Sequence, residues 1–103
     1  MEVNPVWFIN PMNHLSKADA KRVPKWAKMV AVVEDEIYIP AIALAAEVEV
    51  MLCVSYDGVP VLRNSGHLYV PISWGAQNYP HFKETAEHVK RMVREAMDNP
   101  PLQ

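Results

Sequence analysis

The residues best suited to chemistry in this sequence are two histidines and a carboxylate near its C-terminal end. His81, Glu84 and His88 are spaced at i, i+3 and i+7, so on a helix they share one polar stripe. Imidazole and carboxylate groups are ordinary metal ligands, and Glu84 with His88 could supply two of them. The two histidines would nevertheless be about 10 Å apart along the axis, too far for one ion to bind both. We therefore expect an exposed polar face and no metal.

Other patterns that support catalysis are missing from the sequence. The chain has four serines, and none lies in a Gly-x-Ser-x-Gly elbow: Ser16, Ser55, Ser65 and Ser73. With 3 glycines, it has no Gly-rich loop of the kind that binds nucleotide phosphates. The carboxylates at 34–36 lie at the exposed tip of a predicted turn, whereas general acid–base catalysis needs two carboxyl groups in a pocket that separates their pKa values. Cys53 lies among apolar residues without the cationic neighbours that activate a thiol.

These observations favour a protein that is not an enzyme and has no cofactor. An enzyme that depends on a metal or a small ligand, using His67, His81 or His88, remains the second alternative.

A group of basic residues lies in the N-terminal third of the chain. It follows helical spacing and consists of Lys17, Lys21, Arg22, Lys25 and Lys28. The formal net charge of −2 gives no general basis for binding polyanions. We interpret the group as a solvated helix face. A nucleic-acid-binding regulator that uses this basic segment (residues 17–28) is the first alternative function.

The strongest candidate binding surface is an aromatic-rich stretch from residue 67 to residue 82. If alternate residues of a strand at 68–72 face the core, then His67 and Tyr69 face away from it and Tyr69 is exposed. A loop is expected to follow the strand. The six candidate interface residues are His67, Tyr69, Trp74, Gln77, Asn78 and Tyr79. Rigid aromatic rings beside amides are typical of protein-recognition surfaces, although Trp74 and Tyr79 could equally fill the core.

The elements that must position these side chains follow from hydrophobic spacing, prolines and turn residues. In chain order, the sequence first predicts a strand at 6–9 and a helix that starts at Lys17. Around Pro24 two alternatives are open: either this helix ends near Arg22, or a second short helix starts with Pro24 in its first turn. The sequence then predicts strands at 30–33 and 37–39, a helical turn at 40–46 with Pro40 in its first position, strands at 48–56, 59–63 and 68–72, and a helix from Pro80 to about residue 98. Asp57-Gly58 predicts a hairpin, and Pro60 places the 59–63 strand at a sheet edge. On the last helix, Phe82, Ala86, Val89, Val93 and Ala96, with Met97 beside them, form the apolar stripe, and Glu84, His88, Arg91 and Glu95 face water.

Residues 36–43 (EIYIPAIA) and 67–74 (HLYVPISW) share a Tyr-x-Pro core, 31 positions apart. A true repeat would extend over a whole supersecondary unit, but the residues before the two motifs do not match. We therefore expect a proline that ends a strand in each case, and no duplicated unit.

The predicted fold class is α+β: a small, mostly antiparallel sheet of about four or five strands, with a C-terminal amphipathic helix packed on one face and a short N-terminal helix. Residues 1–103 form one domain, with a flexible tail at 99–103. The first eleven residues do not have the positive n-region and long apolar core expected of a signal peptide, and the longest apolar run, 37–46, is too short to span a bilayer. We expect a cytoplasmic protein without membrane contact.

The function expected from these features is that of a non-enzymatic protein-binding module. Such a small protein would dock on another protein as an inhibitor or assembly factor, a role common among proteins of viruses and mobile elements. The adjacent Trp7 and Phe8, which face opposite sides of a strand, also favour a homo-oligomer such as a homodimer.

Overall fold

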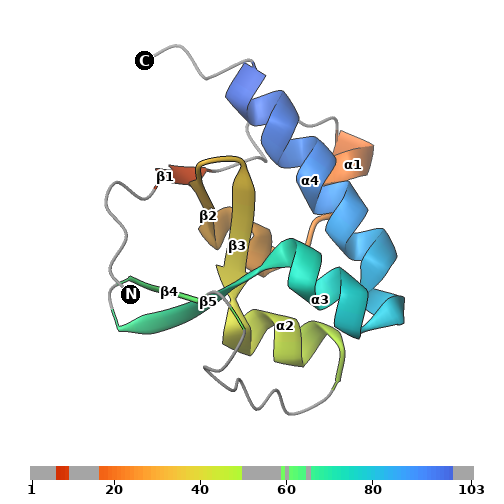
Figure 1. The fold of residues 1–103 in the computed structure, drawn as a ribbon. Coiled ribbons are helices and arrows are strands. Elements are labelled where there is room, and N and C mark those ends of the chain that lie inside the picture. Colours follow the sequence, from red (N-terminus) through yellow and green to blue (C-terminus); the bar gives the residue numbers. More distant parts are fainter. Residues whose placement is uncertain (1–6, 10–16, 50–58, 60, 65, 99–103) are drawn as a thin grey trace.

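The structure is a computed structural model that describes residues 7–9, 17–49, 59, 61–64 and 66–98. Its five strands form one sheet in the order β1-β2-β3-β5-β4, and every neighbouring pair is antiparallel. Helices α2, α3 and α4 lie on one side of this sheet (Figure 1). The predicted α+β class, with the C-terminal helix on one face of a small antiparallel sheet, is confirmed.

The elements alternate short strands with short helices, and only the last helix is long. In chain order they are β1 (Trp7–Ile9), α1 (Lys17–Arg22), the 3₁₀ helix η2 (Lys25–Met29), β2 (Val30–Val33), β3 (Glu36–Pro40), α2 (Ala41–Glu47), β4 (Leu62–Asn64), β5 (His67–Pro71), α3 (Ile72–Asn78), the 3₁₀ helix η3 (Pro80–Phe82) and α4 (Lys83–Asp98).

The β2–β3 hairpin forms where two apolar runs flank the acidic residues. Val33 pairs with Glu36, and the two-residue turn between them places Glu34 at a φ of 56°. A positive φ is uncommon for glutamate and reflects the tight turn that the short loop imposes. β4 lies at the edge of the sheet, as Pro60 predicted, and pairs with β5 alone among the described strands.

Each Tyr-x-Pro motif ends a five-residue strand that runs directly into a seven-residue helix: β3 into α2, and β5 into α3. The residue pairs that flank the two hairpin turns, Val33 with Glu36 and Asn64 with His67, also differ by 31 positions. We call this strand–turn–strand–helix arrangement the hairpin–helix unit. It occurs twice, so the expectation that the similarity ends at the motif was wrong. The order of the elements and their spacing are repeated, although most side chains differ and the positive φ lies on Glu34, the first residue of one turn, and on Gly66, the second residue of the other.

The two hairpin–helix units are related by an approximate twofold axis. β3 and β5 pair antiparallel in the centre of the sheet, so the tyrosine of each motif lies opposite the proline of the other: Tyr38 with Pro71, and Pro40 with Tyr69. Each proline has an extended backbone at the N-cap of the next helix, with ψ of 132° at Pro40 and 137° at Pro71. Because proline has no N–H for the ladder, it ends the strand there. Pro40 is therefore the N-cap, one position before the predicted one.

Two segments differ from the predicted secondary structure. Val48 and Glu49 do not begin a strand, because Val48 is the C-cap of α2 and its N–H donates to the carbonyl oxygen of Leu44 at 3.0 Å. The rest of that predicted strand and the Asp57-Gly58 hairpin lie outside the described residues. Residues 72–78, predicted to complete a strand and enter a loop, form α3 instead.

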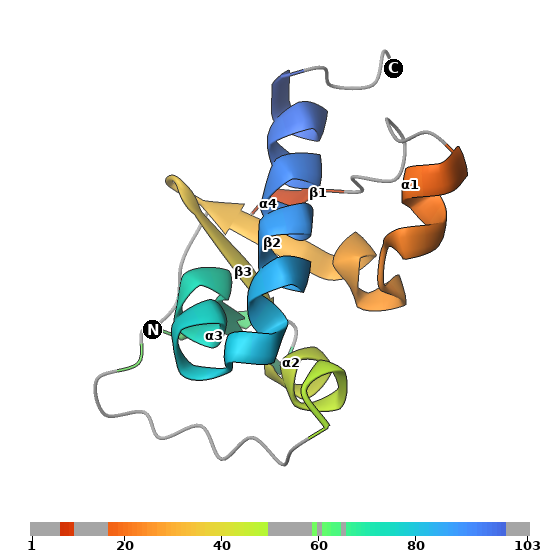
Figure 2. The ribbon, with the colours of Figure 1, turned by 90° about the vertical axis from the view of Figure 1, so that its right-hand side faces the viewer.

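The main core lies between the sheet and the helices. The five residues of the predicted apolar stripe, Phe82 at the end of η3 and Ala86, Val89, Val93 and Ala96 on α4, are all buried, which confirms the amphipathic helix. Met97 is half exposed, and His88, predicted to face water, is buried. Figure 2 shows α1 and η2 beside α4, opposite the side where the β2–β3 turn lies. The buried arc of α4 is therefore wider than the apolar spacing indicated.

A smaller cluster of buried residues is separate from the main core. It consists of Ala31, Leu62 and Tyr69, with Val33 and Tyr38 packed against it. Tyr69 and Tyr38 alternate along their strands with main-core residues, so they belong to the other face of the sheet. This second face of the sheet also buries side chains. Tyr69, which was predicted to face away from the main core, is therefore not exposed to solvent.

Candidate functional site

In the described part of the protein, a groove of about 400 Å³ lies between the β2–β3 turn and the C-terminal half of α4. Its volume is within the range of ordinary ligand and peptide pockets. Apolar side chains of the sheet, of α3 and of α4 line it together with charged ones. The lining residues are Val32, Glu34, Asp35, Glu36, Ile37, Ile72, Lys90, Val93, Arg94, Met97 and Asp98.

One wall of the groove is the acidic turn, residues 34–36. Glu34 and Asp35 are exposed at the hairpin tip. Glu36 is held in place, because Ser73 Oγ at the start of α3 donates a hydrogen bond to its Oε1 at 2.8 Å. This hydrogen bond holds the start of α3 against Glu36, the first residue of β3. One carboxylate of the acidic wall therefore has a fixed position.

The opposite wall is one face of α4. Lys90, Val93, Arg94 and Met97 follow steps of three and four, so they lie along the same side of the helix. Met97 is 51% exposed, and thioether side chains adapt readily to different partner surfaces. Among the described residues, no ion pair joins the cations of this wall to the acidic turn. The groove therefore has an apolar floor between two walls of largely opposite charge.

The acidic turn also affects a side chain outside the groove. The pKa of Tyr38 is raised above 10.0, mainly because burial disfavours the phenolate and also because Glu36 and Glu34 repel its negative charge. The pKa of Tyr69 is raised by burial. Burial is the larger cause of the shift at Tyr38, and the carboxylates of the acidic turn add to it.

The structure does not bring the six predicted interface residues together. Tyr69 is 2% exposed, so the prediction that it is exposed was wrong; Leu62 and Ala31 cover its ring in the second cluster. His67 is exposed at the start of β5. The other four residues lie on α3 and at its C-cap, Tyr79.

The aromatic rings of Trp74 and Tyr79 pack on each other and on the main core. Trp74 and Tyr79 make an edge-to-face contact with centroids 6.0 Å apart. Asn78 Nδ2 donates to the Trp74 carbonyl oxygen at 2.9 Å. Gln77 and Asn78 are exposed. Both rings are partly buried, so they serve the core and still offer an edge to a partner.

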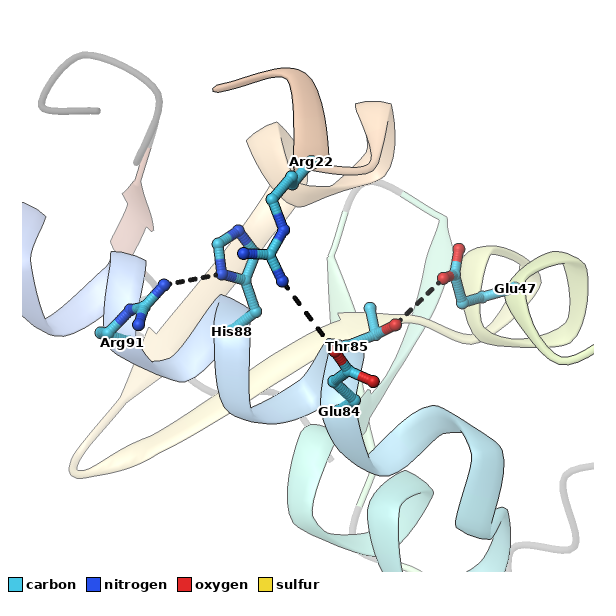
Figure 3. Close-up of polar contacts among 6 residues, drawn as sticks. All are labelled: Arg22, Glu47, Glu84, Thr85, His88 and Arg91. Carbon is cyan, nitrogen blue, oxygen red and sulfur yellow. Dashed lines mark hydrogen bonds and ion pairs between the residues drawn. The ribbon is translucent and has the colours of Figure 1, made fainter. Parts of the chain in front are cut away.

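The basic segment is exposed on α1 and η2, as predicted for a solvated face. Arg22 Nη2 lies 3.9 Å from Glu84 Oε1, an ion pair between two exposed side chains that links α1 to α4 (Figure 3). The lysines at 17, 21, 25 and 28 are exposed.

A polar junction connects α2 with α4 (Figure 3) and also with η2. Glu47 accepts hydrogen bonds from Thr85 Oγ1 at 3.2 Å and from Trp26 Nε1 at 3.5 Å. His81 Nε2 donates to the Val48 carbonyl oxygen at 3.3 Å. These contacts fix the end of α2 against the start of α4, so His81 has a structural partner.

His88 is held by its own helix, because Arg91 Nη2 donates to His88 Nδ1 at 3.1 Å. A guanidinium only donates, so Nδ1 is the accepting nitrogen and the ring proton is on Nε2. Within the described ranges, no three His, Cys, Asp or Glu side chains converge on a position where they could hold a metal ion.

No protein-family model, curated protein or solved structure matches this chain significantly. In the part of the chain that is described, no helix has both the length and the apolar character needed to cross a membrane.

Sequence reasoning did not predict the groove, although it located two of the segments that form it. The acidic turn was recognised as a hairpin tip, and the Val93–Met97 region as part of α4. Their approach depends on the angle at which α4 crosses the sheet, for which the sequence carries no local signal.

Proposed function

We propose that this protein is a non-enzymatic protein-binding module and that its partner binds in the groove. The observation that carries the proposal is a half-exposed methionine, Met97, at the edge of an apolar floor flanked by charged side chains. An apolar anchor surrounded by polar groups is the usual composition of a protein-recognition site. A protein that docks in this way could act as an inhibitor or assembly factor.

The size and composition of the groove support a peptide segment as the bound element. Its floor combines β-branched side chains from two strands, Val32 and Ile37, with Ile72 of α3. One or two apolar side chains of a partner would fill such a volume. The charged walls would then fix the direction in which the segment lies, because they differ in sign.

Site-specific photocrosslinking in native cell extract tests this proposal. A photoreactive amino acid would replace Met97 in the groove, Gln77 at the end of α3, or Ile42, which is 79% exposed on α2 and serves as the control. We expect a discrete crosslinked protein from position 97, and none from position 42.

Two other results are informative. Crosslinking from position 77 but not from 97 would move the docking site to the predicted aromatic surface. Equal labelling from positions 97 and 42 would show non-specific contact and contradict the proposal.

A further inference from the structure

The charges of the groove select the kind of segment that it would bind. Four carboxylates line it, those of the acidic turn and of Asp98, against the two cations Lys90 and Arg94. The groove therefore has an excess of negative charge around an apolar floor. A complementary segment presents an apolar side chain next to positive charges.

The chain itself carries such a segment in η2. Residues three apart in a 3₁₀ helix lie above one another, so Lys25 and Lys28 are on the same face. Both are exposed, and Met29 next to them is 46% exposed, which makes it one of the few large apolar side chains at the surface among the residues that the structure describes. Ala27 is buried and anchors the opposite face of η2.

The groove and η2 of one molecule cannot meet. η2 precedes β2 and the acidic turn follows it, so the two surfaces lie at opposite ends of this four-residue strand, about 13 Å apart at 3.3 Å per residue. In Figure 2, η2 and α1 lie on one side of α4 and the β2–β3 turn on the other. Only a second molecule can bring an η2 into the groove.

We propose that the groove binds η2 of a second copy of this chain, with Met29 on the apolar floor and Lys25 and Lys28 beside the acidic turn. This inference rests on the proposed function, since it names the partner of the same groove. The contact is head-to-tail, with different surfaces on the two molecules. Such contacts continue to further copies unless the rotation closes a ring.

The association is weak and depends on salt. Exposed charge pairs contribute little individually, and the contact would not bury the area of a permanent dimer. Salt on the order of 0.5 M shortens the screening length to about 4 Å and removes most of the attraction. The expected behaviour is a monomer in dilute or salty solution and larger species at high concentration and low salt.

Analytical ultracentrifugation of the full chain tests the contact. The weight-average mass is measured at low salt over about 10 μM to 1 mM, the weak end of the affinity scale. Two variants reverse one surface each: E34K/D35K in the groove, and K25E/K28E on η2. Each variant alone is expected to stay monomeric, with circular dichroism and unfolding midpoints as checks of folding. Mixing the two variants restores association, because each then offers the surface that the other lacks.

A wild-type mass that stays monomeric over this range would overturn the inference. So would two variants that remain monomeric when mixed, or wild-type association that either variant leaves unchanged. Photocrosslinking separates this outcome from the proposed function. A different protein captured from position 97 keeps the groove as a docking site even when self-association fails. If no protein is captured from position 97 and the chain does not self-associate, both the proposed function and this inference are contradicted.

Discussion

Leu44 and Gly75 are each the fourth residue of a seven-residue helix in the two hairpin–helix units, and they lie against each other. A Cβ added at Gly75 would be 3.2 Å from one Leu44 methyl carbon, 3.3 Å from the other, and 3.3 Å from the Phe82 ring. Near an approximate twofold axis, equivalent positions meet, and two leucines would overlap there. The pairing of a large apolar side chain with glycine lets α2 and α3 approach closely.

Replacement of Gly75 by alanine should destabilise the protein by about 1 kcal/mol. Alanine gains up to about 1 kcal/mol in helix propensity, but crowding against the fully buried Leu44 and Phe82 costs about 1–3 kcal/mol. Urea unfolding of Gly75→Ala measures the net change. With Leu44→Val, whose side chain is shorter, the same substitution should become stabilising. An increase of the urea midpoint by Gly75→Ala alone would show that the contact is looser than described.

Substitution of Tyr69 should lower the free energy of unfolding by as much as substitution of a core residue does. Tyr69→Ala removes a buried ring and should cost about 3 kcal/mol or more of unfolding free energy. Tyr69→Phe keeps the ring and should cost about 1 kcal/mol. His67→Ala, on the same strand but exposed, is the matched control and should change stability by less than about 0.5 kcal/mol. Equal effects of Tyr69→Ala and His67→Ala in chemical denaturation would contradict the burial of Tyr69.

The two shifted tyrosines predict a loss of stability at alkaline pH. The pKa values of Tyr38 and Tyr69 are raised in the folded protein above the ordinary 10.0. Their contribution to stability is therefore complete below about pH 10 and decreases as the pH rises through the folded values. Urea midpoints from pH 9 to 11.5, compared among wild type, Tyr38→Phe and Tyr69→Phe, measure it. Each phenylalanine variant should lose less stability over this interval than wild type, and identical pH profiles would refute the assignment.

The hydrogen bond from Ser73 to Glu36 should contribute measurably to the shape of the groove. Ser73→Ala leaves the partly buried carboxylate without this donor and should cost about 1–2 kcal/mol. Thr85→Val, which removes a comparable hydrogen bond to Glu47 on the other side of α4, is the matched control. Both variants should be similarly destabilised, but only Ser73→Ala should shift the NMR signals of Ile37 and Met97. Unchanged signals would mean that Glu36 is positioned by the backbone alone.

The sequence by itself determined most of the local structure. Hydrophobic spacing located α4 and its buried stripe, because a stripe repeated over four turns has few other solutions. Prolines and turn residues located the ends of β2, β3 and β5, because proline lacks the N–H that a ladder needs. The fold class followed from these elements.

Only the tertiary structure decided which residues of these elements are buried and which meet. Tyr69 and His88 lie on faces that periodicity marks as outward, yet packing from other elements covers both. The sequence did not reveal the duplicated unit, because its two copies have the same order of strands and helix but few side chains in common, as Leu44 and Gly75 show. The groove likewise exists only because α4 crosses the sheet beside the β2–β3 turn, and contacts between residues so distant in sequence have no signature in either segment alone.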